Sequence, residues 1–395
     1  MADKIKVCLL VAGFPSEDNP THGLFNKRAA IALAPLVNLS VIQFRLWKPG
    51  RKRLTTYSEN GYQVFVVAVP FIPVYPNACS TINARMMSFF SHSLLEEEIK
   101  NFDIIHVVNA TLAFVPSLWK KKAGFKLVVQ SIGSDLNSEM PAIINQPCVK
   151  WLKRSVDAAT FNSRQLALQY KQLLGTAAVE KIIYRGVDLS DFSNETKNGA
   201  AEKRSITFLY VGGLPAYKNF LYKENTKGGH TLMHAWKKFE QGKYGDRDVQ
   251  LIFAGPDSIK AISLNWHSAL KYPGKVTMPG ILNAKDLLEA YRNADVVIVP
   301  SMEEGLPNAA MEAAACKCAL IGTNAGGIPE VIIDKVSGLL IAAGNETELV
   351  KAMEAYVNEP ALCTRHGMAG RLLMEQQFDQ QNFAPAYVQL YKELL

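Results

Sequence analysis

The chain has 395 residues, 48% of them hydrophobic and 20% charged, a composition typical of a soluble globular protein large enough for two cores. No apolar run approaches the roughly 18 residues of a membrane span, and the amino-terminal KIKVCLLVAGF is too short and too charged for a signal peptide, so we expect it to form a first buried strand. The net charge of +7 accompanies no nucleic-acid-binding motif, and no nucleic-acid partner is expected.

Short runs of β-branched and apolar residues alternate with helical patterns along the whole chain. Before residue 165 the expected strands are KVCLLVA, NLSVIQF, YQVFVVAVP, DIIHVVN, KLVVQS and AATFNS. The second half repeats the scheme with ITFLYVGG, VQLIFAG, DVVIVPS, CALIGTN and SGLLIAA, and residues 359–395 show helical patterns only. Continuous apolar strands with helices between them are typical of parallel sheets covered on both faces.

This order predicts an α/β protein with two doubly wound, Rossmann-like domains. The polar stretch LSDFSNETKNGAAEKR has linker composition. We therefore expect a first domain at 1–195, a second at 196–370, and a helix at 371–395 that packs back toward the first. Ligands of doubly wound sheets bind outside the carboxyl ends of the strands, which predicts a cleft between the domains with one ligand for each half.

The excess of positive charge lies in the first half of the chain. Residues 1–195 contain 22 Lys and Arg against 15 Asp and Glu, whereas residues 196–395 contain 21 of each. The densest basic pieces are WKPGRKR at 47–53 and WKKKAGFK at 119–126. Two interpretations stay open: solvated loops, or a surface that attracts an anionic membrane or a phosphate-bearing partner. The six cysteines form no C-x-x-C pair, which predicts reduced thiols in a cytoplasmic protein.

The stretch SMEEGLPNAAMEAAA places two glutamates on either side of a helix start. Leu306 precedes a proline, which disfavours helical torsions, so the helix is expected to begin at that proline or at Asn308. Glu304 then lies on the loop and Glu312 in the second helical turn. The free amides between them carry the positive end of the helix dipole, which suits a phosphate or a sugar hydroxyl. An isolated pair of glutamates at this spacing is more simply explained as a solvated loop acid and a favourable acid early in a helix. The surrounding sequence therefore decides between this interpretation and a binding site.

The context is a series of strand-end loops. FLYVGGL ends a strand in Gly212 and Gly213, where a missing side chain lets the backbone approach a ligand. KGGHTLMHAWKKF then opens a helix with Lys227 and Gly228. A lysine at a helix start is electrostatically misplaced unless an anion lies there.

These motifs resemble, in order, those of the family-4-type retaining glycosyltransferases, which use nucleotide sugars on the two-domain GT-B fold. Between residues 206 and 342 the matching motifs are YVGGL, KGGHTLMHAW, IFAGP, PGIL, Y..AD, PSMEEGLPNAAMEAAA and GGIPEVI.....GLLI. In the first half GFPSEDNPTHGLF resembles the family's glycine-bearing acceptor-side loop, with Gly23 at the tight position. The stretches DIIH, GSDL, D.ATFNS and RGVDLSDF also match.

The resemblance implies a role for each matching residue on the donor side. Glu304 would touch the donor sugar, and Glu312 would hold the ribose hydroxyls. Lys227 would neutralise the leaving diphosphate. The remaining donor contacts would come from the backbone at Gly212, Gly213, Leu306 and Asn308, and from the backbone near Ile281 at the nucleotide base.

Two histidines in the first half also match the pattern. His106 ends the stretch DIIH, where the family often has a histidine near the reacting sugar, which implies a catalytic role; a strand-end histidine bonded to a backbone carbonyl is the alternative. His22, beside Gly23, would contact the acceptor or the donor. The leaving diphosphate can itself accept the acceptor's proton, so no further protein base is required.

No metal and no cofactor beyond the nucleotide-sugar co-substrate, of the UDP or GDP type, is expected. A lysine and helix-end amides can stabilise the leaving diphosphate without a metal. The sequence contains no D-x-D motif, and no acid accompanies His230 and His234, which lie a helical turn apart.

Three departures from the family pattern matter. Where members carry arginine after the first strand of the nucleotide domain, this chain has Gly213, and Lys218 or Lys223 is a candidate replacement. Before GSD many members carry histidine, and here Ile132 stands in that place. The stretch PAYKNFLYKENT is longer than the usual connection.

The sequence thus predicts a metal-independent retaining glycosyltransferase that moves a hexose to a glycan or lipid-linked acceptor in surface polysaccharide biosynthesis, in the cytoplasm and at the inner face of the membrane. A non-catalytic nucleotide-sugar-binding protein and a nucleotide-sugar epimerase are the alternatives. P-loop enzymes are not expected, because the sequence has no G-x-x-x-x-G-K-[ST] motif. Dinucleotide dehydrogenases are not expected, because the glycines after the first strand are not spaced as G-x-G-x-x-G. The base, sugar, acceptor, linkage and oligomeric state stay open.

Overall fold

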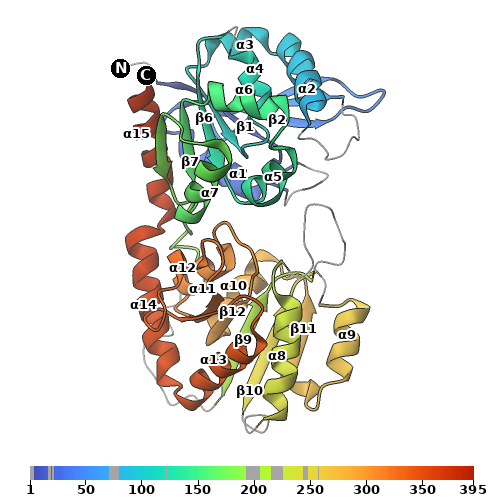
Figure 1. The fold of residues 1–395 in the computed structure, drawn as a ribbon, viewed down its shortest axis with the longest axis vertical. Helices are drawn as coiled ribbons and strands as arrows, with labels where there is room; N and C mark the ends of the chain where they lie inside the picture. Colours follow the sequence, from blue (N-terminus) through green and yellow to red (C-terminus); the bar gives the residue numbers. More distant parts are fainter. Residues whose placement is uncertain are drawn as a thin grey trace. The chain divides into compact units, whose positions relative to one another are not determined.

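The chain forms two compact units (Figure 1). The first contains Met1–Tyr184 and Gln381–Leu395, and the second Arg185–Gln380. The predicted boundary at residue 195 therefore falls inside the second unit, and only the part of 371–395 that follows Gln380 belongs to the first. The computed structural model describes residues 4–16, 19, 22–70, 80–120, 123–192, 205–214, 226–242, 248–256 and 258–395.

The first unit is built on an eight-stranded sheet in the order β3-β4-β2-β1-β5-β6-β7-β8. All neighbouring strands run parallel except β3, which is antiparallel to β4. The strands are β1 (Lys6–Val11), β2 (Asn38–Leu46), β3 (Leu54–Glu59), β4 (Tyr62–Val69), β5 (Ile104–Val108), β6 (Lys126–Ser131), β7 (Ala158–Phe161) and β8 (Val179–Ile182). The sequence did not predict β3 and β8, which are mostly exposed edge strands with no apolar run.

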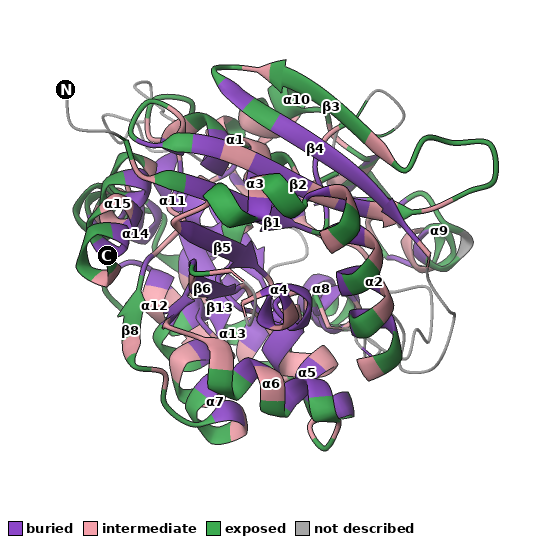
Figure 2. Cartoon of the chain, turned by 90° about the horizontal axis from the view of Figure 1, so that it is seen from above, coloured by how far each residue is buried: buried purple, intermediate pink, exposed green. Residues whose placement is uncertain are grey.

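Helices cover both faces of this sheet. Two separate apolar clusters result, one containing residues of α2, α4, α6 and α7 and the other residues of α1 and the carboxyl-terminal α15. The helices are α1 (Leu24–Leu33), α2 (Thr81–Leu94), α3 (Glu96–Asn101), α4 (Phe114–Trp119), α5 (Met140–Ile143), α6 (Pro147–Ser155), α7 (Arg164–Leu174) and α15 (Phe383–Leu394), with a π-helical turn at Asp135–Glu139. The central strands are buried almost throughout (Figure 2).

The second unit is a six-stranded, fully parallel sheet in the order β11-β10-β9-β12-β13-β14. Its strands are β9 (Ile206–Val211), β10 (Val249–Ala254), β11 (Val276–Gly280), β12 (Val296–Val299), β13 (Ala319–Thr323) and β14 (Leu339–Ile341). Its helices are α8 (Gly229–Gln241), α9 (Ala261–Ser268), α10 (Ala284–Asn293), α11 (Asn308–Ala315), α12 (Ile328–Val331), α13 (Glu346–Asn358) and α14 (Ala361–Gln377), with short 3-10 turns at Pro273–Lys275 and Gln380–Asn382. Both predicted doubly wound domains are confirmed.

The strand order reverses once in each sheet. The reversal lies between β1 and β5 in the first unit and between β9 and β12 in the second. Loops that leave the carboxyl ends of these strands diverge to opposite faces, which opens the place where doubly wound proteins bind ligands. Within the described part of the chain, no helix has both the length and the apolar character needed to cross a bilayer.

Candidate active site

Lys227 and Glu304 meet at the strand reversal of the second unit. Lys227 follows β9 and comes just before α8, and Glu304 lies in the loop between β12 and α11. The Lys227 Nζ lies 2.7 Å from Glu304 Oε2 and 3.0 Å from Oε1. The lysine side chain is 50% exposed and the glutamate side chain 13%. An anion can therefore reach the ammonium group from solvent.

The backbone around Gly228 brings these two loops together. Gly228 has φ 71°, a left-handed conformation, and a Cβ built on it would lie 1.8 Å from the carbonyl oxygen of Pro300. A second link is the hydrogen bond that the Met302 amide donates to the Thr226 carbonyl, at 2.8 Å. Only glycine allows this approach, which holds Lys227 against the end of β12.

Glu312 occupies the position that the sequence predicted. The helix α11 begins at Asn308, so Glu312 lies in its second turn. The hydroxyl of Tyr291, a fully buried side chain, donates a hydrogen bond to Glu312 Oε2 at 3.1 Å. Burial is the main cause that raises the pKa of Tyr291 well above its usual value, and the negative charge of Glu312 is the second. Tyr291 therefore stays a donor at neutral pH and orients the carboxylate.

The starts of α8 and α11 both lie at this strand reversal. Among the described residues, no side chain caps either helix by a hydrogen bond, and neither first turn carries an acid. The positive ends of both helix dipoles therefore favour a negatively charged ligand at this place. Leu306 is buried just before α11, whereas Asn308 is exposed at its first position.

The ends of β9, β10 and β11 lie in a row beside these helix starts. The Gly212 amide donates to the Ala254 carbonyl at 3.0 Å, and the Gly255 amide to the Gly280 carbonyl at 2.8 Å. Gly213 is half-buried and accepts a hydrogen bond from the Tyr210 hydroxyl at 3.1 Å. Ile281 follows β11 as a largely exposed residue. Lys218 and Lys223, the candidate replacements for arginine, lie outside the described residues.

The glycine loop of the first unit is tightly folded after β1. Gly23 has φ 74°, and a Cβ on it would lie 2.3 Å from the Gly13 carbonyl oxygen. The exposed His22 ring lies over Gly13, since a Cβ there would come 2.7 Å from its Cε1 atom. The Asn26 side chain donates to the Gly13 carbonyl at 2.7 Å. Gly23 therefore has the tight geometry expected of it, and His22 lies beside it at the surface.

The prediction that His106 ends its strand is wrong. The strand β5 continues to Val108, and His106 is fully buried in it. Its ring stacks on that of Tyr387 with centroids 4.5 Å apart, and its Nδ1 lies 2.7 Å from the Tyr391 hydroxyl oxygen. Both tyrosines belong to α15, which covers the histidine. His106 packs the core, and we do not retain it as a catalytic candidate.

A polar cluster that the sequence analysis missed lies at the carboxyl ends of β5 and β6. Asn109, the first residue after β5, has φ 100°, a strained value for a side-chain-bearing residue. The Thr111 Oγ1 lies 2.6 Å from both Asn109 Oδ1 and Glu139 Oε2. The buried Asp135 accepts hydrogen bonds from the amides of Ala110, Ile132 and Gly133, at 2.8 to 3.1 Å. The stretch GSDL and the strand reversal are the two signals that could have located it.

The described residues contain no group of three or more His, Cys, Asp and Glu residues able to hold a metal ion. The sequence argument that His234 lacks an acid is wrong, because its Nδ1 lies 2.9 Å from Glu346 Oε1. That acid begins α13 and is shared with Lys238, at 2.7 Å. The hydrogen bond from Lys238 lowers the pKa of Glu346. Glu346 therefore belongs to an ion-paired helix surface.

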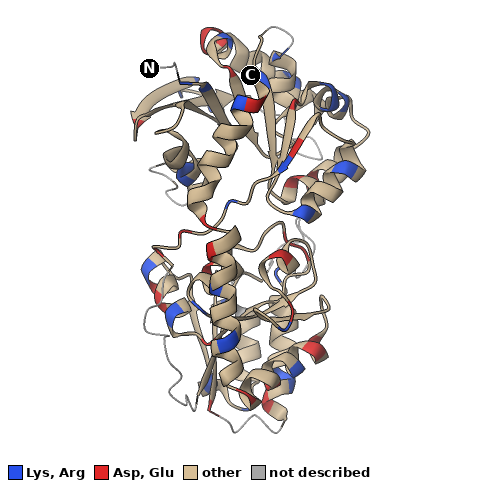
Figure 3. Cartoon of the chain, turned by 90° about the vertical axis from the view of Figure 1, so that its left-hand side faces the viewer, with Lys and Arg blue, Asp and Glu red and all other residues tan. Residues whose placement is uncertain are grey.

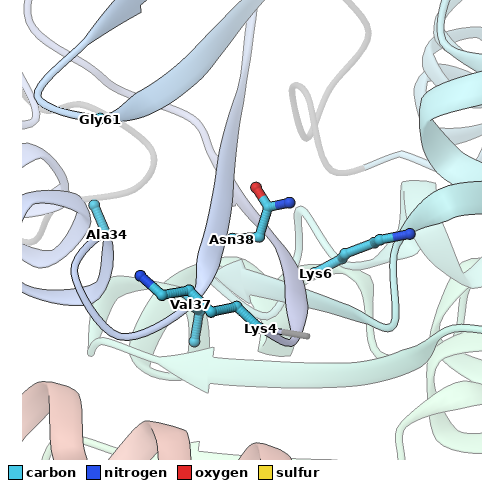
Figure 4. A pocket seen from close by; sticks show the side chains of 6 residues that line it. All are labelled: Lys4, Lys6, Ala34, Val37, Asn38 and Gly61. Carbon is cyan, nitrogen blue, oxygen red and sulfur yellow. The ribbon is translucent and has the colours of Figure 1, made fainter. Parts of the chain in front are cut away.

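A pocket of about 360 Å³ lies at the amino ends of β1 and β2, the opposite edge of the first sheet from the glycine loop (Figure 4). It is lined by Lys4, Lys6, Ala34, Val37, Asn38 and Gly61. Parallel sheets bind their ligands at the carboxyl edge, so we place the candidate site at the strand reversals.

Comparison with known proteins agrees with this geometry. Residues 191–372 match the sequence model of the family described as Glycosyl transferases group 1, a range that includes every donor-side residue discussed above. This part of the chain is therefore similar to group 1 glycosyltransferases. Putative glycosyltransferase YtcC of Bacillus subtilis is 25% identical over 92% of this chain and 90% of its own.

Two solved structures share the fold over nearly the whole length. Sucrose-phosphate synthase from Thermosynechococcus elongatus has a TM-score of 0.73 at 18% identity and covers 98% of this chain and 99% of its own. Anabaena Alr3699/HepE, in complex with UDP, has a TM-score of 0.72 at 16% identity and covers 98% and 100%. The chain therefore has the predicted GT-B fold.

The bond between Tyr291 and Glu312 leads to a prediction about nucleotide affinity. Tyr291→Phe is expected to weaken binding of the nucleoside diphosphate about tenfold, because Glu312 loses the hydrogen bond that orients it. Titration calorimetry measures the effect. The control, Tyr57→Phe, alters a partly exposed tyrosine of the first unit. Equal affinities for the Tyr291 variant and wild type would contradict the positioning role.

Proposed function

We propose that the protein is a retaining, metal-independent glycosyltransferase that takes a sugar from a nucleoside diphosphate of the uridine or guanosine type. The observation that carries the proposal is the half-exposed Lys227 ammonium, paired with Glu304 beside the starts of α8 and α11. A fixed cation and two sets of helix-end amides suit the charge that develops on a departing diphosphate.

In the proposed mechanism Lys227 exchanges one anion for another. The donor diphosphate takes the place of the Glu304 carboxylate at Lys227 and at the helix-start amides, and Glu304 becomes available to the hydroxyls of the sugar. Glu312, held by Tyr291, binds the ribose. The base lies along the backbone near Ile281, and Gly212 and Gly213 let the donor approach the end of β9.

The bond changes balance without a protein base. The bond between the anomeric carbon and the diphosphate oxygen breaks, and the acceptor oxygen bonds to that carbon on the same face. Lys227 stabilises the negative charge that develops on the diphosphate oxygen as the first bond breaks, and the acceptor's proton passes to the diphosphate. HepE supports the choice of donor, since its structures include complexes with UDP and with UDP-glucose.

The acceptor is proposed to be a glycan or lipid-linked sugar of surface polysaccharide synthesis, reached at the inner face of a membrane. In the first unit, the loop with His22 and Gly23 and the cluster of Asn109, Thr111 and Glu139 lie at the sheet edge where an acceptor would bind. The hydroxyl, amide and carboxylate groups there suit sugar hydroxyls.

A thermal-shift panel of UDP, GDP, ADP, CDP and their sugars tests the proposal. At a hundred times Kd a bound nucleotide is expected to stabilise its unit by about 2.7 kcal/mol. The shift should disappear in Lys227→Ala and Glu312→Ala. No shift with any nucleotide would contradict the proposal. Binding without turnover of the bound sugar nucleotide, with or without acceptor, would indicate the non-catalytic alternative.

A further inference from the structure

We propose that one face of the first unit docks on the surface of an anionic membrane. We call it the α2 surface. It is formed by the outward side of α2, the loop at 47–53 and the outward side of α6. The inference deepens the membrane contact of the proposed function. Its test measures vesicle binding, so its failure would leave the proposed donor chemistry intact.

The outward side of α2 carries large apolar side chains. Phe89 is 71% exposed and Ile82 is 54% exposed, two helical turns apart on one side of the helix. The opposite side is buried, and the Trp119 indole of α4 donates to the Ser88 carbonyl there at 3.2 Å. Exposed and buried residues alternate along α2 in Figure 2. Phe89 therefore lies outside the core, although a phenylalanine is normally buried.

The basic loop lies directly beside this apolar side. The Arg53 guanidinium carbon lies 5.5 Å from the ring centroid of Phe90 and 5.7 Å from that of Trp47. The rings of Phe89 and Phe90 meet edge to face at 5.4 Å. These contacts place the loop at 47–53 next to the carboxyl-terminal half of α2.

The helix α6 adjoins the other half of α2. The Arg85 guanidinium carbon lies 5.2 Å from the Trp151 ring centroid. The Thr81 amide at the start of α2 donates to Gln146 Oε1, just before α6, at 2.8 Å. The loop, α2 and α6 therefore form one continuous surface within one compact unit.

The charge of this surface has a single sign. The loop at 47–53 carries four Lys or Arg residues, α2 one and α6 three, and none of the three segments contains Asp or Glu. The nearest acids in sequence lie outside the three segments: Glu96 after α2, Asp157 after α6 and Glu59 after the loop. Basic residues around an exposed aromatic are what an anionic lipid surface binds, since each charge there contributes about 1 kcal/mol, a factor of about five in affinity.

The second basic piece of the sequence, at 119–126, contributes less. Lys120 pairs with Asp157 and also donates to the Ser155 carbonyl, at 2.7 Å. Its charge is therefore partly satisfied inside the unit. Figure 3, which colours Lys and Arg blue along the chain, shows such positions on helices of the first unit. The α2 surface combines such charges with apolar side chains.

Flotation with vesicles tests the proposal on the full chain. Wild type is expected to float with phosphatidylcholine vesicles that contain 30% phosphatidylglycerol, and not with phosphatidylcholine alone. Phe89→Ser is expected to lower the partition coefficient about tenfold, and Phe89→Trp to retain it. Exchange of Lys48, Arg51 and Lys52 for Gln is expected to lower it more than tenfold.

Matched controls distinguish binding through the α2 surface from non-specific binding through exposed apolar side chains or positive charge elsewhere on the protein. Leu168→Ser removes a 58% exposed side chain of α7. The triple exchange of Lys237, Lys285 and Lys351 for Gln removes equal charge from exposed positions of the second unit. Both controls should float like wild type. The proposal would be overturned if wild type failed to bind anionic vesicles, which is the result expected if this face served a protein partner. Equal losses in the control variants would also overturn it.

Discussion

Exchange of Lys227 for Met is expected to lower kcat/KM for the nucleotide-sugar donor by roughly 10²–10³-fold, the usual effect of removing one group that stabilises developing charge. Methionine keeps the length of the side chain and removes the ammonium group that now lies 2.7 Å from Glu304. Turnover of the donor that gives the largest thermal shift measures the effect. The control Lys238→Met alters an exposed lysine of α8, the helix that follows Lys227.

A variant of Glu304, the partner of Lys227, is expected to affect donor binding and sugar transfer differently. Glu304→Gln removes the carboxylate that competes with diphosphate for Lys227, so nucleoside diphosphate affinity is expected to stay equal or rise. Turnover of the sugar nucleotide is expected to fall, because Glu304 is proposed to touch the sugar. A Glu304→Gln variant with wild-type turnover, or a Lys227→Met variant that binds and turns over the donor normally, would contradict these roles.

Exchange of Gly228 for Ala is expected to cost the second unit about 3 kcal/mol of stability. The left-handed backbone accounts for 1–2 kcal/mol of this, and the contact 1.8 Å from the Pro300 oxygen for a similar amount. For a unit of this size Tm should fall by about 6–12 °C. Thermal unfolding measures it, and donor turnover should fall too, because Lys227 loses its support.

Alanine variants of two other glycines distinguish the cost of the backbone strain at Gly228 from the cost of its steric contact. Gly61→Ala also has a positive φ, of 79°, but meets nothing within 4 Å, so about half the loss is expected. Gly274→Ala has neither feature and should change Tm little. If Gly228→Ala were as mild as Gly274→Ala, the tight approach of the two loops would not be the feature that holds Lys227.

Local physics made the main elements predictable. The proline after Leu306 set the start of α11 at Asn308, and apolar runs marked the central strands of both sheets. The same reasoning missed β3 and β8, because edge strands with exposed side chains owe their form to hydrogen bonds with a neighbouring strand rather than to an apolar run.

The candidate site was only partly predictable. Glu304, Glu312 and Lys227 followed from the ordered motifs, since each has a residue type and offset that its strand-end loop requires. The sequence did not indicate that Tyr291 holds Glu312. It also failed for His106, whose surroundings depend on Tyr391, 285 residues further along the chain. No local pattern reports a contact at that separation.

The sequence by itself therefore determined the two doubly wound sheets, the helix starts and the residue types at the strand-end loops, because apolar periodicity, proline and glycine act within a few residues of themselves. Only the tertiary structure decided that Lys227 pairs with Glu304, that α15 buries His106, and that the basic loop lies beside Phe90. Such pairings depend on strand order and on which helix covers which face, and distant parts of the chain set these together.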